Sequence, residues 1–66
     1  MNEYGLVQEP EQPDEAFGAL SDTMGDRVFT LDEAVECIRN VCDVSRQTAY
    51  RRFENLVRNG NIRELA

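Results

Sequence analysis

Apolar residues recur at steps of three and four along the middle of the chain, which is the spacing of one helix face. The recurrence begins directly after Thr30, and Glu33 stands three residues further on. Such a pair is typical of a capping box, in which each side chain accepts a hydrogen bond from the other residue's amide. We therefore predict a helix that starts at Thr30 and carries one apolar stripe, formed by Leu31, Ala34, Val35, Ile38, Val41 and Cys42.

A second periodic segment follows, after Asp43 and Val44 interrupt the first. Ser45 is a favoured N-cap residue, and Gly60 suits the left-handed position just past a helix end. The segment between them predicts a helix over 46–59, with arginines on its polar face. Its expected buried residues are Ala49, Phe53, Leu56 and Val57.

Weaker signals surround these two helices. Pro13, Asp14 and Glu15 are typical of a helix start, and Gly25 is typical of an end. Between them Phe17, Leu20 and Met24 have helical spacing. Val28–Phe29 and the residues from Ile62 onward fit brief extended pieces, the latter with Ile62 facing the core.

Residues 1–12 are acidic and interrupted by proline, a composition typical of poorly ordered segments. We expect a flexible acidic tail over 1–12 that repels DNA, although Tyr4, Leu6 and Val7 could dock on the domain. The predicted fold class is therefore mostly α: a three-helix helix-turn-helix domain over 13–66, which could include a minimal two-stranded sheet.

Charge is distributed unevenly along the chain. The net charge is −6, from thirteen acids and seven basic residues that are all arginine. Residues 1–27 hold the whole excess, whereas 28–66 are balanced, and five arginines lie between Arg46 and Arg63 against one acid, Glu54. The acidic, lysine-free composition resembles that of halophilic, haloarchaeal proteins, unless it is chance in a short chain. The total charge opposes non-specific binding to nucleic acid, but the local arginine excess favours it.

No pattern in the sequence indicates catalysis or a cofactor. The chain has no histidine, no lysine and no phosphate-binding glycine loop, so we expect no enzyme, no metal, no cofactor and no small-molecule substrate. Cys37 and Cys42 lie five apart on one predicted helix, too far apart for a disulfide, and are expected to be small core residues in a reducing compartment. No apolar run is long enough to span a membrane and no secretory signal is evident, which predicts a soluble cytoplasmic protein.

The run from Val44 to Phe53, followed by Leu56, Gly60 and Ile62, resembles the recognition segment of winged helix-turn-helix transcription regulators. In that family a Val-Ser-x-x-Thr-Val-Tyr-Arg-x-Leu run is followed by a leucine, a glycine and an isoleucine that leads into the wing. The resemblance covers about residues 28–64, with Val28–Phe29 similar to the family's first strand.

Three features depart from the family pattern. Asp43 occupies a turn position that is often glycine, and Arg39 stands where a small residue usually packs. No wing follows Ile62, so we expect either a wingless variant or a piece of a longer regulator.

The resemblance implies a sequence-specific DNA-binding transcription regulator that reads the major groove of double-stranded DNA with helix 46–59. We expect a homodimer on a two-fold site, because one helix makes few contacts. Arginine can bond guanine, glutamine can bond adenine, and hydroxyls can hold phosphate. The expected DNA-binding residues are Ser45, Arg46, Gln47, Thr48, Tyr50, Arg51, Arg52 and Arg58.

Other interpretations remain open at this point. Arg52 and Arg58 could form salt bridges rather than backbone contacts, and Arg51 and Arg58 could be a solvated face paired with Glu54. The acidic net charge and the missing wing favour a protein–protein adaptor on a winged-helix-like fold. A third hypothesis is a DNA-mimicking inhibitor that uses the acidic surface of residues 1–27.

Overall fold

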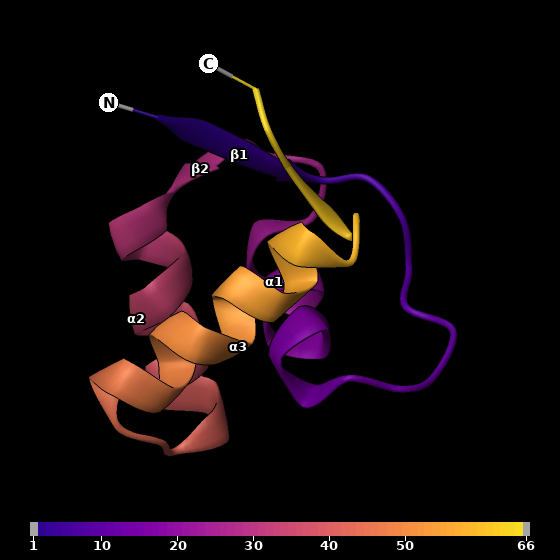
Figure 1. Cartoon of the computed structure of the whole chain (residues 1–66). Coiled ribbons are helices and arrows are strands. Elements are labelled where there is room, and N and C mark those ends of the chain that lie inside the picture. Colours follow the sequence, from indigo (N-terminus) through magenta and orange to yellow (C-terminus); the bar gives the residue numbers. More distant parts are fainter. Residues whose placement is uncertain (1, 66) are drawn as a thin grey trace.

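Residues 2–65 are the part of the chain that the structure, a computed structural model, describes. They form three helices, α1 (Glu15–Met24), α2 (Leu31–Cys42) and α3 (Arg46–Arg58). They also form a small antiparallel sheet of three strands, β1 (Glu3–Leu6), β2 (Phe29–Thr30) and β3 (Ile62–Glu64). Figure 1 shows the helices gathered on one side of this sheet. The predicted class, a mostly α three-helix domain with a minimal sheet, is confirmed.

Side-chain hydrogen bonds cap α1 and α2 where the sequence predicts that these helices begin. The Asp14 side chain accepts a hydrogen bond from the Phe17 amide at 2.9 Å and caps α1. Thr30 and Glu33 form both hydrogen bonds of the capping box at the start of α2. These side chains satisfy amide groups that have no partner inside the helix.

The turn between α2 and α3 occupies only residues 43–45. Asp43 adopts a left-handed backbone conformation with φ of 54°, which aspartate tolerates better than most residues. Ser45 then caps α3 by accepting a hydrogen bond from the Thr48 amide at 3.2 Å. At the other end of α3, Gly60 has the predicted left-handed conformation with φ of 83°. A turn this short holds the two helices side by side.

The sheet differs from the prediction in the origin of its central strand. The strand order is β2-β1-β3, so the N-terminal strand lies between the other two. Tyr4 pairs with Phe29 on one side and with Glu64 on the other, and Leu6 pairs with Ile62. The expected tail over 1–12 is therefore wrong for Glu3–Leu6, because these residues supply the backbone partners that both short edge strands need.

The segment after β1 is also tied to the domain. The Val7 amide donates to the Asn61 carbonyl at 3.0 Å, and Asn61 Nδ2 donates to the Gln8 carbonyl at 3.0 Å. Asn61 is 7% exposed, and these bonds satisfy its buried polar groups. The boundary expected between residues 12 and 13 consequently does not separate a tail from the domain.

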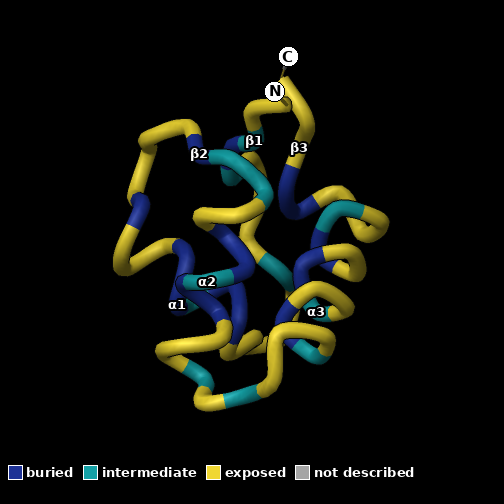
Figure 2. The backbone as a smooth tube through the Cα atoms, turned by 90° about the vertical axis from the view of Figure 1, so that its left-hand side faces the viewer, coloured by how far each residue is buried: buried dark blue, intermediate teal, exposed yellow. Residues whose placement is uncertain are grey.

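The core fills the space between the helices and the sheet. Figure 2 shows the buried residues along the inward sides of all three helices and at the strands. Phe29 and Ile62 bring the sheet into this core, and each is 1% exposed. On the helices the core includes Ala16, Phe17, Leu20, Ala34, Val35, Ile38, Ala49, Phe53 and Leu56.

The predicted apolar stripe of α2 is wrong at its last turn. Val41 is 59% exposed, while Cys42 is only half-buried. Cys42 still packs against the core, so Val41 lies at the exposed edge of the stripe, and periodicity alone cannot show where that edge falls. Cys37 is buried as expected, and its Sγ lies 3.4 Å from the Ala19 carbonyl that accepts its hydrogen bond.

Candidate nucleic-acid interface

One face of α3 is exposed over the length of the helix. Ala49, Phe53 and Leu56 are buried, whereas Gln47 and Arg51 are exposed one turn apart on the opposite side. Glu54, Asn55 and Arg58 continue this exposed stripe. A helix of thirteen residues is about 20 Å long, and a major groove about 12 Å wide admits such a helix. The exposed face therefore has suitable dimensions for entering a groove.

The two hydroxyl groups expected to hold phosphate are engaged at the start of the helix. Ser45 Oγ accepts from the Thr48 amide and donates to Thr48 Oγ1 at 3.0 Å. Thr48 is half-buried, and Ser45 is exposed. The two hydroxyls thus cap the N-terminus of α3. Ser45 is the more exposed of the two and the better placed to contact a phosphate as well.

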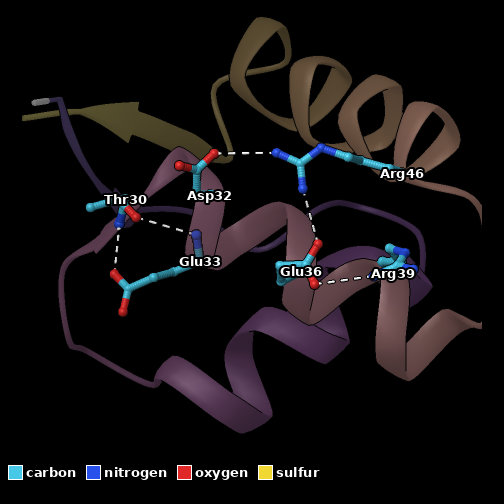
Figure 3. Close-up of polar contacts among 6 residues, drawn as sticks. All are labelled: Thr30, Asp32, Glu33, Glu36, Arg39 and Arg46. Carbon is cyan, nitrogen blue, oxygen red and sulfur yellow. Dashed lines mark hydrogen bonds and ion pairs between the residues drawn. The ribbon is translucent and has the colours of Figure 1, made fainter.

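Arg46 points back toward α2, where it meets two carboxylates at the surface (Figure 3). Its Nη1 lies 3.0 Å from Oε2 of Glu36, and its Nη2 lies 3.4 Å from Oδ1 of Asp32. The second carboxylate oxygen of Glu36 lies 3.2 Å from Nη1 of Arg39. We call these four residues, Asp32, Glu36, Arg39 and Arg46, the α2–α3 ion cluster.

The position of Arg39 corrects the sequence comparison. Arg39 was expected at a small, packed position of the first motif helix, but its side chain is 48% exposed and belongs to the ion cluster. The small buried residues of α2 are Ala34 and Cys37. Because Arg39 points outward, it does not hold the two helices apart.

Arg52 lies on the side of α3 that is turned toward α1. Its Nη1 is 3.4 Å from Oε1 of Glu15, so it forms a salt bridge, one of its two expected roles. Cys42 lies beside this pair, and burial, followed by the charge of Glu15, raises the pKa of the Cys42 thiol. The shift favours the protonated thiol, which is a weaker nucleophile than the thiolate.

Arg51 and Arg58 are exposed and form no ion pair within residues 2–65. The expected pairing of Glu54 with either of them is not formed there. Tyr50 is 43% exposed and flanks Arg51. Four of the expected DNA-binding residues are thus exposed on one surface of α3: Gln47, Tyr50, Arg51 and Arg58. Arg46 and Arg52 instead form salt bridges with acidic residues.

A hollow of about 320 Å³ borders this surface, between α3, the start of α2 and the sheet. Its apolar lining comes from Tyr4, Leu31, Tyr50, Phe53 and Val57, with charged residues Glu54, Arg58 and Glu64 around them. The sequence indicated only that Tyr4 could dock on the domain and did not place Tyr4 or Leu31 beside α3, because β1 is positioned by pairing with strands distant in sequence. The signal available was the apolar Tyr4–Val7 patch within an otherwise polar segment.

No group of three or more His, Cys, Asp or Glu residues is arranged to hold a metal ion in the described part of the chain. Within the same residues, no helix has both the length and the apolar character needed to cross a membrane.

Comparison of the chain with protein-family models, with curated proteins and with solved structures finds no significant match.

Proposed function

We propose that this protein is a sequence-specific DNA-binding transcription regulator that reads the major groove with α3. The observation that carries the proposal is the exposed stripe on α3, where Gln47, Arg51 and Arg58 share one face and neither arginine forms an ion pair within residues 2–65. Arginine and glutamine at helical spacing can bond base edges, and an arginine two turns away can hold a phosphate. The exposure of Ser45, Arg46 and Gln47 supports this use, because it places the start of α3 at the surface.

The net charge of −6 is the main physical objection to DNA binding. Much of the acidity lies in the segment before α1 and in α1 itself, where Glu9, Glu11, Asp14 and Asp22 are exposed. Charges separated from the DNA by more than about 8–10 Å are largely screened at 0.1–0.15 M salt. Association should consequently depend on the local charge around α3 more than on the total.

The first test is the substitution Arg51→Ala. We expect it to weaken binding to a preferred duplex by about 1–3 kcal/mol, because a base or phosphate contact is lost while the exposed site leaves the fold intact. Binding would be measured by fluorescence anisotropy over a salt series, after selecting a preferred duplex from a random pool. Circular dichroism would verify helicity.

Arg27→Ala is the matched control, because it removes the same charge from an exposed arginine in the connection between α1 and β2. It should change DNA affinity much less than Arg51→Ala. Equal affinity of Arg51→Ala and the unaltered chain, with intact helicity, would contradict a readout role for the α3 stripe.

The proposal includes a homodimer on a two-fold DNA site and a cytoplasmic location. A single small module buries little surface against DNA, so two copies are needed for tight specific binding. We expect a duplex with two half-sites about 34–36 Å apart to bind two chains cooperatively, and a single half-site to bind weakly. Analytical ultracentrifugation of the complexes would show the stoichiometry, and equal, independent binding to the two half-sites would contradict dimer recognition.

A second candidate function is a protein–protein adaptor, which the partly apolar hollow beside α3 favours. Tyr4, Leu31, Tyr50 and Val57 offer an apolar lining to a partner side chain. The same salt series separates the two functions. A folded chain that binds no duplex from the random pool even at the lowest salt concentration favours the adaptor.

A further inference from the structure

The α2–α3 ion cluster has an arrangement that a simple surface salt bridge does not have. Asp32 and Glu36 lie one turn apart on α2, and they contact different terminal nitrogens of the same arginine, Arg46 (Figure 3). Arg46 is the first residue of α3, at the end of the helix that enters a groove in helix-turn-helix proteins. The two carboxylates therefore pair with an arginine that the proposed DNA complex would use.

We infer that Asp32 and Glu36 are an autoinhibitory contact that competes with DNA phosphates for Arg46 and lowers the DNA affinity of α3. This inference rests on the proposed function. In the free protein Arg46 is neutralised by α2, and in the complex it exchanges its carboxylate partners for phosphate oxygens. The two acids thereby set how much of the charge of α3 is available to nucleic acid.

The contacts are suited to exchange because they are exposed. The side chain of Arg46 is 61% exposed, and those of Asp32 and Glu36 are 79% and 43% exposed. Ion pairs in such positions are weak, since water and salt screen them and long side chains lose freedom when they pair. A phosphate can therefore displace either carboxylate without disturbing the core.

Arg39 makes the exchange easier at Glu36. Glu36 uses one carboxylate oxygen for Arg46 and the other for Arg39. When Arg46 turns to a phosphate, Glu36 keeps the cation of Arg39 and does not become an isolated negative charge beside the DNA. Asp32 has no second basic partner within the described residues, so it retains its repulsion toward the phosphates.

The exchange also predicts an unusual salt dependence. An arginine that neutralises a phosphate releases about one counterion, which contributes about −0.9 to the slope of log K against log salt. When Arg46 leaves the cluster, Asp32, Glu36 and Arg39 together keep one net negative charge, so the cluster takes up about one cation and the release is offset. The unaltered chain should therefore show a shallower slope than a variant in which Arg46 is free.

The experiment is a double-mutant cycle between Glu36→Gln and Arg46→Ala, with DNA affinity measured over a salt series. We expect Glu36→Gln to tighten binding roughly two- to fivefold at low salt, which is the range of an exposed ion pair. The slope should steepen by up to about one unit. In the Arg46→Ala background the same substitution should change neither quantity. Asp32→Asn is a second variant of the same kind and should act in the same direction.

Asp43→Asn is the matched control. The native Asp43 carboxylate is exposed in the α2–α3 turn and forms no ion pair with the cluster. Asparagine also tolerates the left-handed conformation of this position. Asp43→Asn should change affinity less than Glu36→Gln does.

The possible outcomes are distinct. A gain that requires Arg46 supports the inference. No gain, or an equal gain in the Arg46→Ala background, overturns it and indicates general repulsion, while a loss with Arg51→Ala would still support the proposed function. Absence of DNA binding by every variant at low salt overturns both.

Discussion

A chain that lacks residues 1–7 is expected not to fold. Those residues include the whole of β1, which pairs with β2 on one side and with β3 on the other. Without it, strands of two and three residues have no partner, and the buried face of the sheet opens to water. A domain of this size is stable by only about 3–10 kcal/mol, so the loss of a central strand should exceed its stability.

Thermal unfolding followed by circular dichroism would test this expectation. The control is the double substitution Glu9→Gln and Glu11→Gln, which removes two charges from the same end of the chain and leaves β1 intact. We expect this control to keep the melting temperature close to that of the unaltered chain. A truncated chain that melts cooperatively at the unaltered temperature would show that β1 is dispensable and that these residues act as a tail.

Phe53→Ala is expected to destabilise the domain by about 3–5 kcal/mol. Phe53 is 2% exposed in the middle of α3, and its ring meets the Tyr4 ring edge to face, with centroids 5.1 Å apart. The substitution removes both the buried area and the aromatic contact, which connects α3 to β1. In a domain of 60–100 residues each kcal/mol corresponds to about 4–8 °C in melting temperature, so most of the variant should be unfolded well below the normal transition.

Urea unfolding of Phe53→Ala beside Phe53→Leu gives the measurement and its control. Leucine keeps most of the buried volume and should retain a cooperative transition at reduced stability. An alanine variant with an unchanged urea midpoint would mean that the buried face of α3 is assigned incorrectly. The exposed assignment of Arg51, on the opposite side of the helix, would then also be wrong.

The candidate interface was predictable in part. The spacing of Ala49, Phe53 and Leu56 determines which side of α3 is buried, and the opposite side follows from helix geometry. That reasoning correctly exposes Gln47, Arg51 and Arg58. It treats Arg46 as another unpaired cation, because nothing in a linear pattern shows that acids on the preceding helix lie within 3.0–3.4 Å of it.

The sequence by itself determined the helices and their ends. Thr30 with Glu33, Ser45, and Gly60 act on groups within three or four residues of themselves, so their effect does not depend on the rest of the fold. Helical periodicity is equally local. These signals were sufficient for the class of fold and for the rotation of α3.

Only the tertiary structure decided how the ends of the chain are used. Tyr4 and Glu64 are sixty residues apart in sequence but paired in the sheet, and strands of two to four residues are too short to show a period. The same is true of Arg46, which is neutralised by residues ten and fourteen positions earlier, and of Val41, which is 59% exposed near the end of α2. Each depends on which segments meet when the helices and the sheet pack together, a property of the whole chain that local spacing does not contain.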